Sequence, residues 1–209
     1  GLLLLLDHRG VEPGMGIGRF LGAAHPGMHF CGIELDTLSG RIARVLYPHH
    51  DIHIANVRDV EFPPVQGVTG NVPFSDVRYS WEGHPVSLHE YCFAKSLSCL
   101  ALGGILALIV THYLLDRQDP SFRALLATHA DFLGAVRLPS GALEGSQIVA
   151  DIVFFRKRLS GAFPAHVDHQ WAQTTPMLLD GHEVRVSTYF QHHRHMLLGT
   201  YSHEDRLYG

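Results

Sequence analysis

Two kinds of apolar pattern alternate along the chain. Short apolar runs are typical of strands, and segments whose apolar residues recur about every three or four positions are typical of amphipathic helices. The predicted strands begin with a short lead at 11–12 and continue at 29–36, 51–55, 65–70, 105–110, 132–138 and 147–155. The predicted helices span 17–24, 38–46, the segment from Ser87 to the glycines at 103–104, and the segment from Asp119-Pro120 to about 129.

This alternation determines the expected sheet. A strand that is followed by a helix and then by another strand requires a parallel sheet with helices on both faces. The last two predicted strands have little helix between them, which indicates a hairpin and an antiparallel final strand. The sequence therefore predicts an α/β fold with a seven-stranded, mostly parallel sheet, an antiparallel final strand and helices on both faces.

Two stretches differ in character from the rest. Residues 75–87 carry Tyr79, Trp81, Gly83 and Pro85, and we expect a mobile loop there, which beside a site would serve as a lid or a substrate-contacting flap. Toward the C-terminus the composition shifts to short apolar pieces among His and polar residues. We therefore expect one domain over 1–158, followed over 159–209 by a linker and a small C-terminal extension with a hairpin around 180–181.

Composition limits the partners and the compartment. With 16 Lys and Arg against 20 Asp and Glu, the 209-residue chain has a formal net charge of −4, so phosphate contacts alone would not hold a nucleic acid. The 3 cysteines form neither a metal spacing nor an even disulfide set, which indicates a reducing cytoplasm. The 17 histidines lack a zinc-binding spacing, so we expect no metal. The apolar run at 2–6 is too short for a signal peptide, and no run is long enough to span a membrane.

A glycine-rich turn follows the first predicted strand. Gly14, Gly16 and Gly18 stand at alternate positions, which permits positive φ angles and a close approach of the backbone to a ligand. Glu34 lies near the end of the next strand, where nucleotide-binding αβ folds place an acid that accepts hydrogen bonds from ribose hydroxyls. A plain turn between a strand and a helix explains the glycines about equally well.

The chain is organised around the stretch Gly70 to Phe74, at the end of the fourth predicted strand. It places an amide side chain, a carbonyl held by the following proline and an aromatic ring close together. That set suits the binding of a flat base that carries an exocyclic amine. The alternative is structural: Asn71 would cap a turn and Phe74 would fill the core.

Four stretches, taken in order, carry a resemblance to a known family. They are Glu12 to Phe20, Gly32 to Asp36, Gly70 to Phe74 and Val149 to Phe154. Together they resemble the N6-adenine class of S-adenosylmethionine-dependent DNA methyltransferases, above all the methylase-like domains in very large helicase-containing proteins of plasmids and phages. The likeness covers roughly residues 9–158, and it implies a Rossmann-like class I methyltransferase fold.

The resemblance implies S-adenosyl-L-methionine as the cofactor. The residues that would cradle its methionine part are Glu12, Pro13, Gly14, Gly16 and Gly18. Glu34 would bind the ribose, and its neighbour Leu35 belongs to the same cofactor set. Asn56 stands just after the third strand, where the family usually has an Asp that accepts a hydrogen bond from the adenine amine. The amide oxygen of Asn56 can still accept this hydrogen bond.

The resemblance also assigns the catalytic residues as Asn71, Val72, Pro73 and Phe74. The Asn71 side-chain oxygen and the Val72 carbonyl would accept hydrogen bonds from the target amine, and Phe74 would stack on the flipped base. Two acceptors localise the lone pair of the amine and align it for direct displacement at the methyl group. The implied activity is that of a DNA (adenine-N6) methyltransferase.

Two alternatives stay open. The same site would suit the side-chain amide of a protein glutamine, which related enzymes methylate. The chain would otherwise be a non-catalytic cofactor-binding or DNA-binding module of a larger helicase-type protein, which the net acidity and Asn56 favour. Because no target-recognition region is evident, the expected partners are adenine-containing DNA and a helicase or target-recognition region in the same or a partner chain. The implied setting is the cytoplasm of a bacterium that carries a plasmid or phage.

Overall fold

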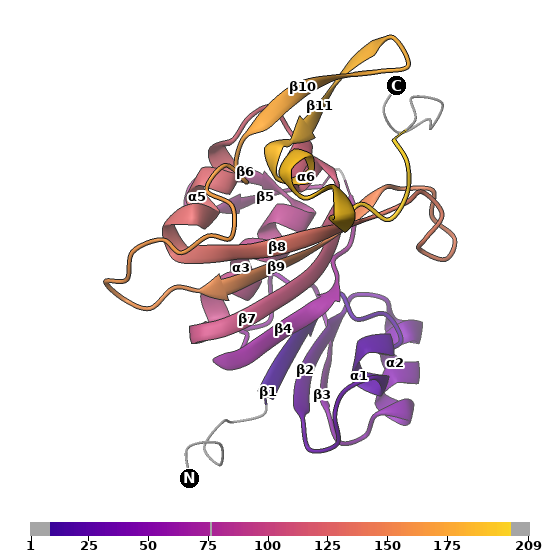
Figure 1. Cartoon of the computed structure of the whole chain (residues 1–209). Coiled ribbons are helices and arrows are strands. Elements are labelled where there is room, and N and C mark those ends of the chain that lie inside the picture. The colour runs from indigo at the N-terminus through magenta and orange to yellow at the C-terminus, as the bar shows by residue number, and fades with distance from the viewer. Residues whose placement is uncertain (1–8, 76, 202–209) are drawn as a thin grey trace. The chain divides into compact units, whose positions relative to one another are not determined.

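The computed structural model describes residues 9–75 and 77–201, and the apolar run at 2–6 lies outside them. The main sheet has 7 strands in the order β3-β2-β1-β4-β7-β9-β8 (Figure 1). Its last strand along the chain, β9 (Ala150–Lys157), lies between β7 (Leu100–Thr111) and β8 (Ala130–Leu138) and runs opposite to them. The predicted α/β fold with a mostly parallel sheet and an inserted antiparallel strand is confirmed.

The contacts within the chain divide it into two compact units. The first unit holds the residues up to Leu108 together with Arg156–Gly161, and the second holds Ile109–Phe155 together with the residues from Ala162 onward. The predicted domain boundary between 158 and 159 stays a prediction.

Four strands form the centre of the first unit. They are β1 (Arg9–Pro13), β2 (His29–Glu34), β3 (Asp51–Ile54) and β4 (Val65–Asn71). β1 pairs in parallel with both β2 and β4, and β2 pairs in parallel with β3. Because these strands are parallel, their carboxyl ends share one edge of the sheet. Glu34 and Asn71 are the last residues of their strands and therefore lie at that edge.

The helices of the first unit begin at identifiable caps. They are α1 (Arg19–Gly22), α2 (Thr37–Leu46) and α3 (Leu88–Cys99). The Asp36 carboxylate accepts the Ser39 N–H at 2.7 Å and so caps α2. Ser87 and Glu90 form a reciprocal capping box at the start of α3. α1 is shorter than the predicted helix over 17–24, because the backbone at Gly18 is left-handed, with a φ of 83°, and starts the helix late.

Two predictions in this unit were wrong. The stretch 75–87 contains an antiparallel hairpin, β5 (Arg78–Trp81) with β6 (His84–Ser87), where we expected a mobile loop and no strands. Val86 anchors the hairpin because its side chain is buried. The helix expected to reach 103–104 ends at Cys99, and both glycines lie in β7. Gly104 fits there because a Cβ atom would come within 2.9 Å of a backbone oxygen of the same strand.

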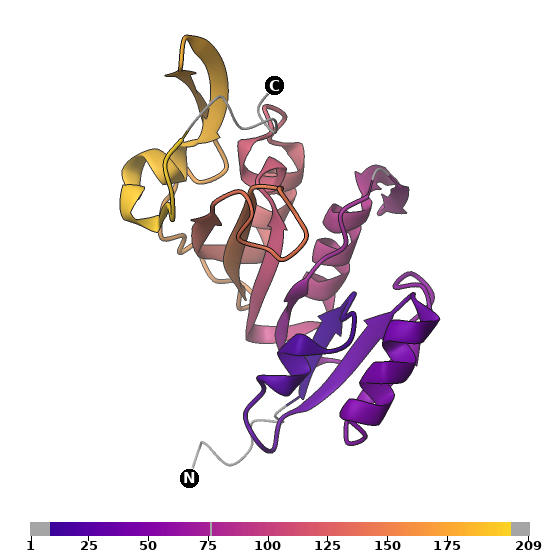
Figure 2. The same cartoon turned by 90° about the vertical axis from the view of Figure 1, so that its right-hand side faces the viewer.

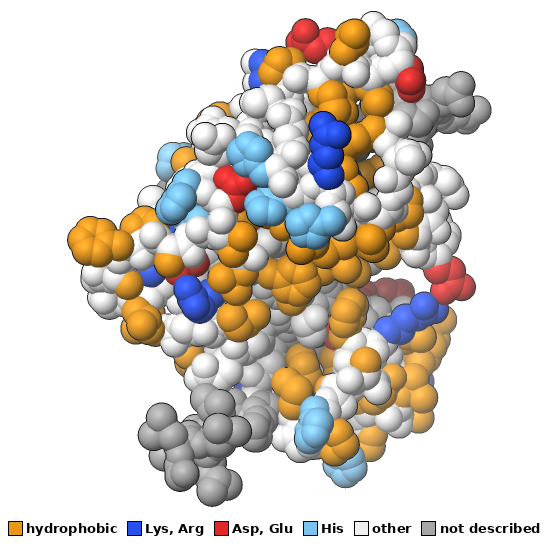
Figure 3. Space-filling model, viewed as in Figure 1, with side chains coloured by type: hydrophobic (Ala, Val, Ile, Leu, Met, Phe, Trp, Pro, Cys, Tyr) orange, Lys and Arg blue, Asp and Glu red, His pale blue; other side chains and the backbone are white. Residues whose placement is uncertain are grey.

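Helix α2 presents its apolar side to solvent. Its buried residues are Gly40 and Ala43, whereas Leu38 and Val45 on the opposite side are 67% and 80% exposed. Apolar residues at helical spacing usually mark the buried side of a helix. Here the helix lies so close to the sheet that a Cβ atom on Gly40 would come within 2.7 Å of Ile54. Figure 3 shows the resulting gathering of hydrophobic side chains over α2.

The second unit combines the end of the sheet with the C-terminal residues. Its further elements are α4 (Tyr113–Asp116), α5 (Ser121–His129), β10 (Thr174–Leu179), β11 (His182–Ser187), α6 (Thr188–His192) and the short 3-10 helix Arg194–Met196. The predicted hairpin around 180–181 is confirmed, since β10 and β11 pair antiparallel (Figure 2). Trp171 stacks on Phe132 with ring centroids 4.8 Å apart, so the C-terminal residues complete the core over β8.

A buried ion cluster lies in the second unit. Arg137 donates to both oxygens of Asp151 at 2.8 Å and to Asp116 at 2.7 Å. Burial raises the pKa of the Asp151 carboxyl, and the neighbouring Arg137 guanidinium opposes that rise. The cluster links β8, β9 and α4, because each residue comes from a different element.

Other features bear on the function. No helix in the described part of the chain is long and apolar enough to cross a membrane. Within residues 9–75 and 77–201 no three or more His, Cys, Asp or Glu side chains gather as metal ligands would. Cys31, Cys92 and Cys99 are free thiols.

Candidate functional site

The glycine turn after β1 packs directly against the turn after β4. Gly14 has a φ of 68°, and a Cβ atom there would lie 2.8 Å from Cδ of Pro73 and 3.8 Å from the carbonyl oxygen of Asn71. Only glycine combines this backbone conformation with this approach. Gly16 also has a positive φ, of 58°, but no atom of residues 9–75 or 77–201 lies within 4 Å of its Cβ position. The turn therefore contacts Pro73 on one side and leaves open space beside Gly16.

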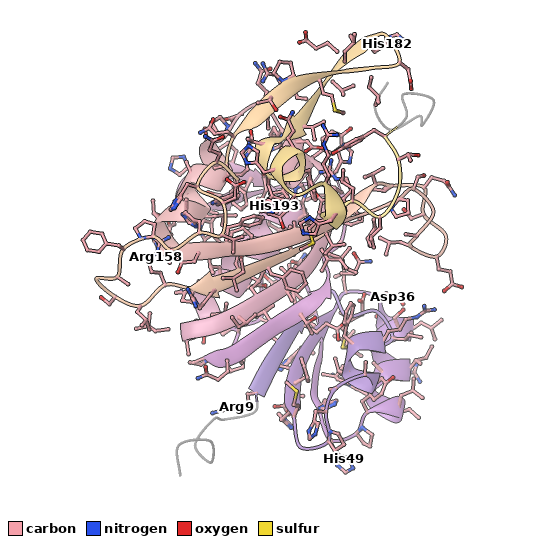
Figure 4. All side chains as sticks on the ribbon, in the orientation of Figure 1. Arg9, Asp36, His49, Arg158, His182 and His193 are labelled. Carbon is pink, nitrogen blue, oxygen red and sulfur yellow. The ribbon has the colours of Figure 1, made fainter. Side chains whose placement is uncertain are left out.

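Glu34 ties the glycine turn to the end of β2. One carboxylate oxygen accepts the Gly16 N–H at 2.7 Å, and the other accepts the Asp36 N–H at 2.6 Å. Asp36 marks the N-terminal end of α2 (Figure 4). A carboxylate has about four lone-pair sites, so two remain for a ligand. The carboxylate is therefore held in place and can still accept hydrogen bonds from hydroxyl groups.

Asn56 is held at both ends of its side-chain amide. Its Oδ1 accepts the Arg58 N–H at 2.9 Å, and its Nδ2 donates to the Tyr79 hydroxyl at 3.3 Å. Asn56 follows β3 and Tyr79 lies on β5, so these contacts join the sheet edge to the hairpin. The predicted site did not include Tyr79.

A cavity of about 140 Å³ brings these residues together. It is lined by Gly14, Ile33, Glu34, Leu35, Ala55, Asn56, Val57, Pro73, Tyr79 and Leu88. Leu35 is 68% exposed and stands over the cavity as an apolar side chain. The structure thus places five residues of the predicted site around one space. The other predicted site residues do not line it: Glu12, Pro13, Gly16, Gly18, Asn71, Val72 and Phe74.

Glu12 lies beneath the glycine turn, near the end of β1. It is 1% exposed, and one of its carboxylate oxygens has no hydrogen-bond partner among the described residues. Burial raises its pKa from 4.5 to about 8; a backbone hydrogen bond from Leu21 opposes the rise and the charge of Glu34 adds to it. A buried carboxyl of this kind carries a proton at neutral pH. A cation close to it favours the ionised carboxylate and lowers its pKa again.

The turn predicted to be catalytic spans the end of β4 and the residues after it. Asn71 ends the strand and its side chain is exposed, whereas Val72 is buried at 1% exposure. Pro73 is exposed at the glycine turn, and Phe74 is half-buried. The exposed amide of Asn71 therefore lies two residues before Pro73, which lines the cavity. Phe74 follows directly after that proline.

The hairpin positions Tyr79 through aromatic contacts. Its ring stacks on Tyr91 of α3 with centroids 4.8 Å apart, and Trp81 meets the Tyr91 ring edge-on at 5.6 Å. Tyr91 is buried, so it fixes the hairpin against α3. The signal in the sequence was the pair of aromatic residues at alternate positions, which marks one face of a strand.

The comparisons with known proteins agree with this geometry. The chain superposes with a TM-score of 0.63 on a protein of Listeria monocytogenes assigned to the class I S-adenosylmethionine-dependent methyltransferases, at 16% identity over 75% of this chain and 55% of that one. The methyltransferase subunit of a type I restriction-modification system from Streptococcus thermophilus gives a TM-score of 0.64 at 18% identity, over 75% and 41% of the two chains. The chain has the class I methyltransferase fold. In this fold the cavity lies where the carboxyl ends of the parallel strands meet.

One curated protein is related in sequence. It is the Defense against restriction protein B of Escherichia phage P1, 28% identical over 162 residues. That match takes in 70% of this chain and 7% of the phage protein, so the chain corresponds to a small part of that relative. The chain matches no protein-family model. The solved structures thus establish the class I methyltransferase fold of this chain.

Proposed function

We propose that this chain is an S-adenosylmethionine-dependent methyltransferase domain that acts on the N6 amine of adenine in DNA. One observation carries the proposal. The glycine turn and the Asn71-Val72-Pro73-Phe74 turn touch at Gly14 and Pro73, next to a cavity that Glu34 and Asn56 line. A cofactor held at the first turn would thus present its methyl group toward an amine held at the second.

The cofactor would lie along the carboxyl edge of the sheet. The cavity of about 140 Å³ is smaller than the roughly 300–1,000 Å³ of typical ligand pockets, which suits one ring system of the cofactor. We place the adenine there, between Leu35 and Pro73, with its amine donating to Asn56. Glu34 would accept from the ribose hydroxyls, and the open space at Gly16 would receive the methionine part.

Glu12 and the glycine turn would complete the cofactor site. The methionine part carries an ammonium group, and the cofactor also carries a sulfonium. A protonated Glu12 can lose its proton and pair with such a cation. Its Oε2, which has no hydrogen-bond partner among the described residues, is the atom that would accept this contact. Pro13 and Gly18 would fix the two ends of the turn.

The target amine would be held by acceptors and made nucleophilic by them. The Asn71 side-chain oxygen and the Val72 carbonyl would accept hydrogen bonds from the two N–H groups of the amine, so that its lone pair points at the methyl group. Attack would form the N–CH₃ bond and break the bond between that methyl group and sulfur, and the amine would then lose a proton to solvent. Phe74 would stack on the flipped base, which is worth on the order of 1–3 kcal/mol and offsets part of the cost of unstacking.

DNA as the substrate is supported by the relatives. The phage P1 relative is named for defence against restriction, and a structural neighbour belongs to a restriction-modification system. Methylation of adenines would protect DNA in the cytoplasm of a bacterial host. Because the net charge is −4, we infer that much of the DNA grip comes from a helicase or target-recognition region in the same or a partner chain.

Methyl transfer from labelled cofactor to DNA tests the proposal. Native chain, Asn71→Ala and Gln66→Ala are incubated with single- and double-stranded adenine-containing DNA and, separately, with a protein fraction. Gln66 is the matched control, because it is an exposed amide on the same strand. We expect label in DNA for the native chain and Gln66→Ala and none for Asn71→Ala, which should still bind S-adenosylhomocysteine.

The other outcomes separate the alternatives. Label in protein but not in DNA would indicate a glutamine methyltransferase. Cofactor binding without any transfer would indicate a non-catalytic module. Full activity of Asn71→Ala would remove the catalytic assignment of the turn.

A further inference from the structure

The outer side of α2 carries apolar side chains that the helix does not need for its attachment to the sheet. Gly40 and Ala43 are the residues that α2 buries. Four large apolar side chains are exposed on the other side, at spacings that place them along one face of the helix (Figure 3): Leu38, Ile42, Val45 and Leu46. These four residues form the outer strip. Contiguous exposed apolar surface commonly marks a contact with another molecule.

The outer strip lies in a basic stretch of an acidic chain. Residues 37–50 contain two Arg and two His but no Asp or Glu, although the whole chain has a net charge of −4. Arg41 is exposed and stands four residues before Val45, so it borders the strip on the helix surface. Arg44 is committed elsewhere, because its guanidinium donates twice to the Ile52 carbonyl, at 2.9 and 3.2 Å. The strip is therefore apolar with a positive charge along one edge.

The shape and charge of this surface indicate the kind of partner. The strip follows one face of a 10-residue helix, so it is narrow and about 15 Å long. An amphipathic helix presents apolar side chains at the same spacing and fits a surface of this form. Acidic residues along the flank of that helix would meet Arg41, and such charge complementarity favours the correct partner over others.

Two other occupants match the surface less well. Arg41 lies at the middle of α2, so an antiparallel two-fold pairing of two copies would bring one Arg41 against the other, and like charges oppose that contact. Helices that bind membrane surfaces carry a polar face rich in Lys and Arg. In α2 only Arg41 would serve this purpose, because Arg44 is bonded to the Ile52 carbonyl.

We propose that the outer strip of α2, together with Arg41, is the docking surface for an acidic amphipathic helix of a partner protein. The inference goes beyond the proposed methyl transfer and does not depend on it. The four residues of the strip do not line the cavity assigned to the cofactor. Docking on the strip therefore requires neither bound cofactor nor DNA.

Fluorescence anisotropy with two labelled peptides tests the proposal. Each peptide has about 20 residues, long enough to form helix in water, and carries Leu at the first and fourth positions of every heptad. One peptide has Glu at the positions that flank the Leu residues, and its twin has Lys there. The native chain is compared with Arg41→Glu, Val45→Asn and Leu178→Asn. Leu178 is the matched control, because it is 75% exposed and lies on β10, whereas Val45 is 80% exposed on α2.

We expect the native chain to bind the acidic peptide roughly three- to tenfold more tightly than the basic twin. High salt should narrow this preference, because it screens exposed charges. Arg41→Glu should reverse the preference. Val45→Asn should weaken binding of the acidic peptide about tenfold, the effect of one lost apolar contact, and Leu178→Asn should bind as the native chain does. All three positions are exposed, and thermal unfolding verifies that each variant is folded.

Several results would overturn the inference. They are no binding of the acidic peptide to the native chain, equal binding of the two peptides, and undiminished binding by Val45→Asn. A native dimer in sedimentation equilibrium that excludes the peptide and is lost in Val45→Asn would assign the strip to a second copy. Flotation of the native chain, but not of Val45→Asn, with vesicles of phosphatidylserine and phosphatidylcholine would assign it to a membrane surface. Each of these results leaves the proposed methyl transfer untouched, because none of the measurements involves cofactor or DNA.

Discussion

Replacement of Glu12 by Gln tests how a buried acid affects the stability of the fold. The Glu12 carboxyl is 1% exposed, and its Oε2 finds no hydrogen-bond partner in the described part of the chain. Gln has nearly the same shape as a protonated Glu and cannot ionise. The variant therefore keeps the native packing and removes the titration.

The magnitude follows from the raised pKa. Burial lifts the pKa of Glu12 from 4.5 to about 8, and at about 1.4 kcal/mol per pKa unit this corresponds to at most roughly 5 kcal/mol. Because the folded-state pKa lies above the unfolded value, the stabilisation from the protonated group is complete below about pH 4.5. It is lost as the pH rises through about 8. A loss of this size is comparable to the ~5–15 kcal/mol that stabilises a typical domain.

Urea unfolding between pH 5 and pH 9 measures the effect. We expect native protein and Glu12→Gln to have similar free energies of unfolding at about pH 5, and the variant to be the more stable by several kcal/mol at about pH 9. Glu61→Gln is the control, because Glu61 is exposed. If Glu12→Gln loses stability with pH as steeply as native protein does, Glu12 ionises freely in the fold and the reasoning fails.

Three further results are expected. Gly14→Ala should destabilise the fold by about 1–3 kcal/mol and weaken cofactor binding, whereas Gly16→Ala, with open space at its Cβ position, should cost less in thermal unfolding. Cys92 should resist thiol reagents until the protein unfolds, because burial raises its pKa to about 12; fast labelling of folded protein would contradict this. Arg137→Met should lower the free energy of chemical unfolding by about 3–5 kcal/mol, because it leaves two buried carboxylates without their positive partner. The double variant Arg137→Met/Asp151→Leu should recover part of that free energy.

The sheet was predictable because its strands have local signals. The strands around Phe30 and Leu106 are apolar runs flanked by turn residues, and the alternation with helices fixes a parallel arrangement. Helix caps are equally local features, since the Asp36 and Ser87 side chains each accept a hydrogen bond from a backbone N–H three residues on. Such features depend on neighbours in the sequence and need no knowledge of the fold.

The errors arose where the outcome depends on distant residues. The glycines at 103–104 favour a helix end on local grounds, but they lie in β7, a strand whose place is set by its sheet partners. The alternation of Tyr79 and Trp81 with polar residues spans only the strand 78–81, and the hairpin depends on Tyr91 of α3 for its place. The contact between Asn56 and Tyr79 joins residues 23 positions apart. No local pattern contains it, so the sequence could supply Asn56 as a candidate but not its hydrogen bond to Tyr79.

The outward apolar side of α2 has a consequence for work with the purified chain. Small residues, Gly40 and Ala43, fasten the helix to the sheet, so folding does not require large apolar side chains at Leu38 and Val45. A strip of this kind in water favours self-association at the concentrations that calorimetry uses. Polar replacements at these two positions should reduce self-association of the purified chain, because they remove exposed apolar surface. They leave the contacts of Gly40 and Ala43 with the sheet unchanged.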